Sequence, residues 1–125
     1  MSENKRKLRR RHIRSYMGVH NAADLELLGQ LVDITQKGLL VITSSPVEAG
    51  WEAELIIKLS TVLDGVTEIQ FQARCAWCEP DINPRFNAVG FEIKKISPQN
   101  RKLIQLLIEN YGLRLLSPED QEEDD

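Results

Sequence analysis

Two short polar clusters hold the residues whose types and spacing could do chemistry. The first lies in a segment too polar to bury itself and consists of arginines: Arg9, Arg10, Arg11 and Arg14. The second offers a carboxylate, a hydroxyl and a glycine: Asp33, Thr35 and Gly38. A guanine presents the acceptors O6 and N7 to a planar guanidinium, and its Watson–Crick edge presents donors that suit a carboxylate. The two clusters are therefore complementary to the two edges of guanine.

Each cluster also has a simpler interpretation. A basic amino-terminal segment is often a solvated tail or a nonspecific polyanion binder, whose affinity would fall steeply with salt. The net charge of -3 and the few aromatic residues weigh against nucleic acid as the partner. The second cluster could form a local turn, in which Asp33 and Thr35 bond the backbone and Gly38 supplies an unusual dihedral angle.

The spacings Arg10-xxx-Arg14 and Asp33-x-Thr35-xx-Gly38 together resemble the PilZ family, bacterial domains that bind the second messenger cyclic di-GMP. Thr35 stands where the family usually has serine, and it keeps the hydroxyl group. The likeness covers most of the chain, and the other matching segments are Leu28-Gly29-Gln30-Leu31-Val32, Ala73-Arg74-Cys75-Ala76-Trp77 and Val89-Gly90-Phe91-Glu92.

This resemblance implies which residues bind the ligand. The cyclic di-GMP site would be formed by Arg9, Arg10, Arg14, Asp33, Thr35 and Gly38, with Arg11 and Trp77 as further candidates. The protein would clamp the dinucleotide between the arginine arm and the barrel surface and signal to an unidentified effector protein. Arg9, directly before the arginine pair, also suggests capture of two stacked ligand molecules.

An alternative within the same family is an adaptor that binds no nucleotide and acts through protein contacts alone. Neither function requires a cofactor. The sequence shows no glycine-rich phosphate loop, no nucleophile with a matching base and no carboxylate pair in an acid/base setting, so we expect a binding module and not an enzyme. We expect a monomer or a weak dimer.

Length and charge predict one domain between two charged ends. The 125 residues are 42% hydrophobic, which suits a single compact core. We expect a flexible basic arm at 1–12, a barrel with a helix at 13–112 and a flexible acidic tail at 113–125, because blocks of like charge repel themselves. No apolar run reaches the roughly 18 residues that span a bilayer, and no signal-peptide pattern follows the basic start. A cytoplasmic protein without membrane insertion is the resulting prediction.

The dominant hydrophobic period between the ends is two, which is typical of strands. Residues 51–60 and 69–77 alternate in this way, and Asp64-Gly65 between them is a turn signal, so the two runs predict a long antiparallel hairpin. Further strands are expected at 13–21, 28–34, 39–43 and 89–93. About six strands at this spacing favour a mainly β fold, a small closed six-stranded antiparallel barrel without exposed edges.

One helix is expected after the strands. Ser97 is a good N-cap, and Pro98 suits the first helical position, where its missing N–H costs nothing. The helix should end near Gly112. Its wide apolar face is expected to pack against the barrel and contains Leu103, Ile104, Leu106, Leu107, Ile108 and Tyr111.

Cys75 and Cys78 have the CxxC spacing of metal and redox sites. In an extended strand an offset of three places the two thiols on opposite faces, and the histidine spacing fits no usual zinc pattern, so we predict no metal site. Cys75 is expected in the core. The same parity places Trp77 on the inward face as a core residue, although its position near a strand end would also allow stacking against a purine.

Overall fold

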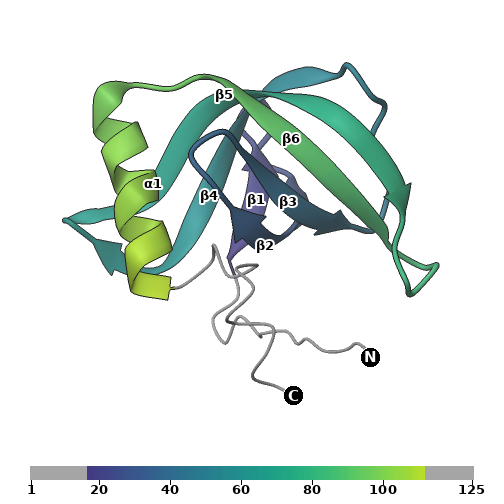
Figure 1. The fold of residues 1–125 in the computed structure, drawn as a ribbon, viewed down its shortest axis with the longest axis horizontal. Helices are drawn as coiled ribbons and strands as arrows, with labels where there is room; N and C mark the ends of the chain where they lie inside the picture. Colours follow the sequence, from purple (N-terminus) through teal and green to yellow (C-terminus); the bar gives the residue numbers. More distant parts are fainter. Residues whose placement is uncertain (1–16, 112–125) are drawn as a thin grey trace.

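The computed structural model describes residues 17–111, which form a closed antiparallel barrel of six strands and one helix beside it (Figure 1). Each strand pairs with its neighbours in the order β1-β2-β3-β6-β5-β4, and β1 pairs with β4 to close the barrel. This confirms the fold predicted from the sequence. The elements are β1 (Gly18–Asn21), β2 (Leu27–Ile34), β3 (Gly38–Thr43), β4 (Glu52–Leu63), β5 (Val66–Pro80), β6 (Asn87–Lys95) and α1 (Pro98–Tyr111).

Several sequence predictions concern residues outside the described range. The boundaries of the arm and the tail, their flexibility and the expected strand residues at 13–16 belong to this group. So do all four arginines of the first cluster: Arg9, Arg10, Arg11 and Arg14. These predictions remain predictions.

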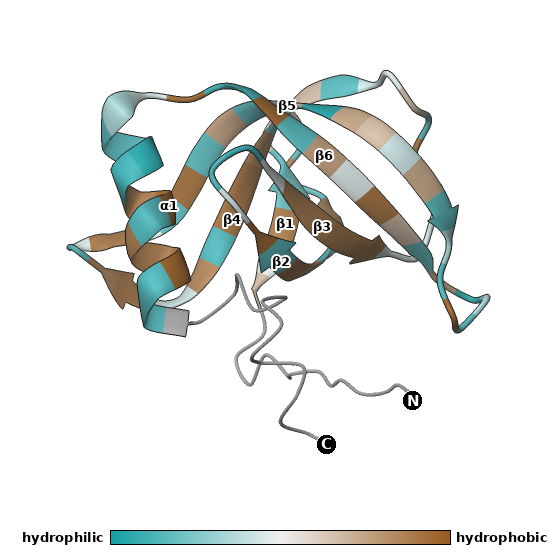
Figure 2. Cartoon of the chain, viewed as in Figure 1, coloured by the Kyte–Doolittle hydropathy of each residue, from teal (hydrophilic) through white to brown (hydrophobic). Residues whose placement is uncertain are grey.

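The barrel interior follows the predicted alternation of strand residues. Along β5, every second side chain from Ile69 to Cys75 is buried, and the residues between them face outward or are half-buried. Figure 2 shows the same alternation of hydrophobic and hydrophilic residues along β4 and β5. Because all the inward residues join one hydrophobic cluster, the barrel has a single core.

The β4–β5 hairpin turns where the sequence predicted it. Asp64 and Gly65 both have positive φ, 54° and 78°, as a two-residue hairpin loop with the twist of the flanking strands requires. Leu63 pairs with Val66 across this loop.

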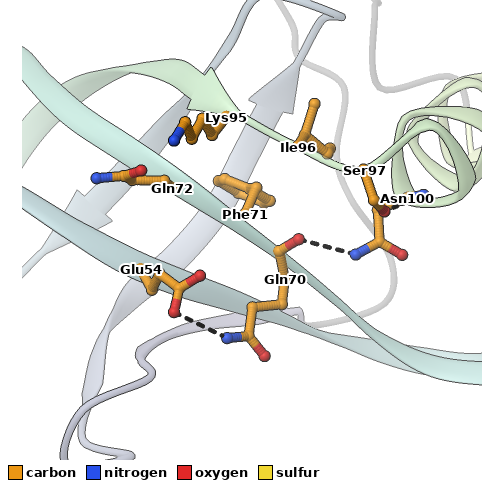
Figure 3. A pocket seen from close by; sticks show the side chains of 8 residues that line it. All are labelled: Glu54, Gln70, Phe71, Gln72, Lys95, Ile96, Ser97 and Asn100. Carbon is orange, nitrogen blue, oxygen red and sulfur yellow. Dashed lines mark hydrogen bonds between the residues drawn. The ribbon is translucent and has the colours of Figure 1, made fainter.

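Helix α1 begins as its sequence signals predicted. The Ser97 hydroxyl oxygen accepts a hydrogen bond from the Asn100 backbone N–H at 3.1 Å, which caps the first turn. The Asn100 side chain donates to the Gln70 carbonyl oxygen at 2.9 Å and ties this turn to β5 (Figure 3). The buried face of α1 joins the barrel core, as expected, through Leu103, Ile104, Leu107 and Ile108.

A β-bulge in β5 overturns the parity prediction beyond Cys75. Cys75 pairs with Phe91, but Trp77 pairs with Gly90, so Ala76 is an extra residue without a partner. The side-chain alternation is therefore reversed after the bulge. Trp77 is 42% exposed and is not a core residue.

The same bulge brings the two thiols to one face of β5. Cys75 is fully buried, and Cys78 is half-buried and packs against the same core. Both sulfur atoms approach Val47: its N–H donates to Cys78 Sγ at 3.4 Å, and its carbonyl oxygen lies 4.0 Å from Cys75 Sγ. The prediction of opposite faces was wrong, although the predicted core position of Cys75 is confirmed. Burial raises the pKa of the Cys75 thiol, which disfavours the reactive thiolate.

Candidate ligand groove

Four strands bring residues distant in the sequence into one line on the outer face of the barrel. Asp33 of β2 pairs with Leu40 of β3, Leu40 pairs with Gly90 of β6, and Gly90 pairs with Trp77 of β5. Asp33 and Trp77 therefore stand at the two ends of a row, with a glycine next to the tryptophan. Only the bulge in β5 gives Trp77 this outward position.

A second row runs beside the first. Gly38 of β3 pairs with Glu92 of β6, and Glu92 pairs with Arg74 of β5. The Arg74 guanidinium lies 3.5 Å from the Glu92 carboxylate. The two rows enclose a shallow depression of about 360 Å³, called here the outer groove, which is lined by Asp33, Ile34, Thr35, Lys37, Gly38, Leu39, Leu40, Ala76, Trp77, Gly90, Phe91 and Glu92.

Asp33 is a buried carboxylate at the edge of the outer groove. Its side chain is 9% exposed, and its Oδ1 accepts a hydrogen bond from the Ile34 N–H at 2.9 Å. Desolvation by burial raises the pKa of Asp33 to about 6, and the hydrogen bond only partly offsets this effect. Within residues 17–111, no cation forms an ion pair with this carboxylate. It therefore carries a charge at neutral pH that the described surroundings do not compensate.

Replacing Asp33 with asparagine should stabilise the fold, and more so at high pH. The ordinary pKa of 3.8 rises to about 6 on folding, so the stability contributed by Asp33 falls as pH rises between these values. The asparagine side chain would keep the acceptor for the Ile34 N–H without the charge. At 1.36 kcal/mol per pH unit, Asp33→Asn should raise the free energy of unfolding by about 2 kcal/mol more at pH 7.5 than at pH 4.5. Urea unfolding at both pH values measures the gain, and an equal gain at both would contradict it.

Thr35 organises a tight turn between β2 and β3. Its N–H donates to the Gly38 carbonyl oxygen at 2.8 Å, and its Oγ1 accepts from the N–H groups of Lys37 at 3.1 Å and Gly38 at 3.3 Å. Residues 35–38, called here the 35–38 turn, are thus held by the threonine hydroxyl. The local-turn interpretation holds for Thr35, whose side chain nevertheless remains exposed at the groove.

The glycine at position 38 is explained by strand packing. Gly38 does not have a positive φ, so the interpretation as an unusual dihedral angle was wrong. A Cβ here would lie far inside van der Waals contact with the Phe91 carbonyl oxygen of β6. Only glycine allows the two backbones to approach this closely.

Gly90 has a different role, because the Trp77 side chain occupies the space where a side chain at position 90 would lie. A Cβ on Gly90 would overlap the indole ring of Trp77. The ring therefore lies over the β6 backbone, with part of its surface open to solvent. An exposed indole held in this way is a platform on which a purine could stack.

The candidate site residues predicted from the sequence did not include two charged residues of the outer groove. Lys37 lies inside the second cluster and is an exposed cation at the groove, and Glu92 adds a carboxylate from β6. The position of Lys37 between Thr35 and Gly38 was a signal that could have identified it. No local pattern connects Glu92 to the cluster, because only the β3–β6 pairing brings it there.

Comparison with known protein families decides the identity of this barrel. A family model described as the PilZ domain matches residues 4–110. The chain belongs to the PilZ domain family. PilZ domains are receptor or adaptor domains associated with cyclic di-GMP signalling.

Solved structures show the same PilZ fold. The PilZ domain of YcgR from Escherichia coli with c-di-GMP is 14% identical, with a TM-score of 0.61 over 79% of this chain and 82% of that one. The inhibitor of motility MotI/DgrA of Bacillus subtilis is 16% identical, with a TM-score of 0.62 over 87% of this chain and 52% of that longer one. Comparison with curated proteins gives no match.

Other site classes find little support in the described part of this PilZ domain. Residues 17–111 contain no group of three His, Cys, Asp or Glu side chains that could hold a metal ion. Over the same residues, no helix is long and apolar enough to cross a membrane. A second, larger depression of about 490 Å³ lies between β5 and the start of α1, but it contains none of the predicted ligand residues (Figure 3).

Proposed function

We propose that this PilZ domain is a receptor for cyclic di-GMP and that the ligand lies in the outer groove. The observation that carries the proposal is the row across four strands, which places the Asp33 carboxylate and the exposed Trp77 ring on one surface. A guanine needs an acceptor for its Watson–Crick edge and a flat surface for its face. The row offers both.

The charges of the groove explain why the arginine arm is required. The Asp33 carboxylate has no ion-pair partner within residues 17–111, whereas the Glu92 carboxylate is paired with Arg74 and Lys94, and Lys37 is the single cation among the lining residues. A ligand with two phosphates would be repelled by the Asp33 carboxylate unless further cations approach it. Arg9, Arg10 and Arg14 would supply these charges and engage guanine edges bidentately.

Ordering the arm sets a minimum on the contacts that it must make. Fixing one residue costs about 1–2 kcal/mol, whereas one bidentate arginine–guanine contact gives roughly 1–3 kcal/mol of discrimination. A single arginine could not offset the ordering of six residues. The clamp therefore uses both arginines of the pair together with the barrel, and the closed arm forms the new surface that a partner protein would recognise.

A second function, an adaptor that binds no nucleotide, is favoured by one feature of the site. The Thr35 hydroxyl accepts two backbone hydrogen bonds within the 35–38 turn and donates one to the Gly38 carbonyl oxygen at 3.4 Å, so its two lone pairs and its proton are already used. In an adaptor the outer groove would contact a protein, and no nucleotide would compete with that partner.

Trp77 fluorescence tests the receptor function at its proposed platform. Cyclic di-GMP should quench the emission of the wild-type protein. Trp77→Phe should lose the quench and retain affinity within about threefold, because phenylalanine still stacks. Trp77→Ala should bind about tenfold more weakly, as expected for the loss of one stacked base.

Trp51 provides the internal reference in this experiment. Its ring packs edge-on against Phe91, with centroids 6.5 Å apart, and it does not line the groove. A quench that persists in Trp77→Phe, or an unchanged affinity in Trp77→Ala, would remove the platform from the site. Absence of binding to the wild-type protein would favour the adaptor.

A further inference from the structure

The 35–38 turn is joined to the C-terminal helix by side-chain hydrogen bonds. Arg101 of α1 donates from Nη1 to the Gln36 carbonyl oxygen at 3.1 Å and lies 3.3 Å from Gln36 Oε1. One guanidinium group therefore holds both the backbone and the side chain of Gln36, in the middle of the turn that forms one wall of the outer groove.

The connection continues along one face of α1. Gln36 Nε2 donates to Gln105 Oε1 at 2.9 Å, and Gln105 Nε2 donates to Glu109 Oε2 at 2.9 Å. Because Arg101, Gln105 and Glu109 are spaced by four residues, they lie above one another on the helix surface. The 35–38 turn thus bonds directly to Arg101 and Gln105, and Gln105 extends the chain of hydrogen bonds by one more helical turn to Glu109.

The opposite side of the 35–38 turn is fixed to the barrel. The Ile93 N–H of β6 donates to the Lys37 carbonyl oxygen at 2.8 Å. Gln36 and Lys37 are consecutive residues, so the turn is held between α1 on one side and β6 on the other. A shift of this turn by a ligand would change its contacts with α1, because the barrel contact limits the other directions of movement.

We propose that Arg101 is a positioning residue for the ligand turn and that nucleotide binding and helix docking stabilise each other through Gln36. The proposal rests on the proposed function and names α1 as the element that responds to it. If docked α1 raises the affinity of the groove by some factor, bound ligand must raise the stability of docked α1 by the same factor. The helix would then present a different surface to a partner in the bound state.

Calorimetric titration of cyclic di-GMP into variants of the 125-residue chain tests the positioning role. Arg101→Met should bind about fivefold more weakly, near the lower end of typical coupling factors. Lys102→Met is the matched control, because it removes the same charge from the next position, which is exposed and makes no hydrogen bond to the 35–38 turn. Arg101→Lys should recover part of the loss, since lysine restores the charge and a donor.

Hydrogen exchange of the α1 amides provides a measurement that a merely structural role would not change. Cyclic di-GMP should slow exchange at 103–110 at least threefold in the wild-type protein and in Lys102→Met, and much less in Arg101→Met. Equal affinity and equal protection in Arg101→Met and Lys102→Met would overturn the coupling. If the wild-type protein does not bind cyclic di-GMP, the receptor function is wrong. If it binds and the two variants behave alike, only the coupling to α1 is wrong.

Discussion

Asp33→Ala should weaken the binding of cyclic di-GMP at least tenfold, which corresponds to about 1.4 kcal/mol. The carboxylate is the acceptor at the end of the row that faces Trp77, and it is held in place by the Ile34 N–H. Without it, the donors of one guanine edge would lose a charged acceptor, and hydrogen bonds to charged groups are the stronger ones. Calorimetric titration of the folded variant measures the loss.

Two comparisons separate the ligand role of Asp33 from a role in folding. Asp81→Ala removes the same group from the β5–β6 connection, outside the lining of the groove, and should bind normally. Asp33→Ala should also keep a cooperative unfolding transition near the wild-type temperature at pH 7.5, because removal of the buried charge offsets loss of the acceptor for the Ile34 N–H. Wild-type affinity in Asp33→Ala would exclude Asp33 from the site.

Gly38→Ala should destabilise the fold by about 2 kcal/mol, within the usual range for forcing an extra methyl group into a packed region. The cause is the close approach of β3 to β6 at the Phe91 carbonyl oxygen, which leaves no room for a Cβ. Because this oxygen belongs to the backbone of a paired strand, the contact cannot be relieved by a side-chain rotation. Chemical unfolding measures the effect.

The Gly38 experiment also decides between two roles for this glycine. If glycine is required at position 38 only to leave room for a ligand, Gly38→Ala would keep wild-type stability and bind cyclic di-GMP more weakly. Gly65→Asn is the control for replacing a glycine in this barrel, because asparagine tolerates the positive φ at position 65 and nothing lies within 4 Å of its Cβ. It should change stability by less than about 0.5 kcal/mol, as is usual for surface positions.

The barrel and the helix could be predicted because local signals and packing agree. Ile69, Phe71 and Ala73 alternate with polar residues, and the core contains the residues that this period selects. Ser97 and Pro98 marked the start of α1 for the same reason, since an N-cap acts through neighbouring backbone groups. Such interactions lie within a few residues and are visible in the sequence.

The position of Trp77 could not be predicted because it depends on a bulge. Nothing between Cys75 and Trp77 indicates that Ala76 lacks a partner, and one extra residue reverses every side chain that follows it. The same bulge explains why the prediction for the two thiols was wrong: Cys75 and Cys78 were expected on opposite faces of β5 and lie on one face. The alternation of residues predicts which face a side chain occupies only up to the first β-bulge in a strand.

Long-range contacts were the other part of the site that sequence reasoning missed. The hydrogen bond between Gln36 and Arg101 joins residues 65 positions apart, and each residue alone looks like an ordinary exposed polar side chain. Glu92 reaches the groove only through the pairing of β3 with β6. The family resemblance predicted Asp33, Thr35 and Gly38 as ligand residues, and the structure places them in the lining of the groove, but their neighbours there could be found only from the fold.

Isothermal titration of cyclic di-GMP into the 125-residue chain at near-physiological salt, with GTP and cyclic di-AMP as controls, is the direct test of the receptor function. We expect saturable heat with cyclic di-GMP alone, and the stoichiometry distinguishes one bound molecule from a stacked pair. Absence of heat, together with unshifted amide resonances of Asp33, Lys37 and Trp77 on addition of the ligand, would contradict the receptor function and favour the adaptor.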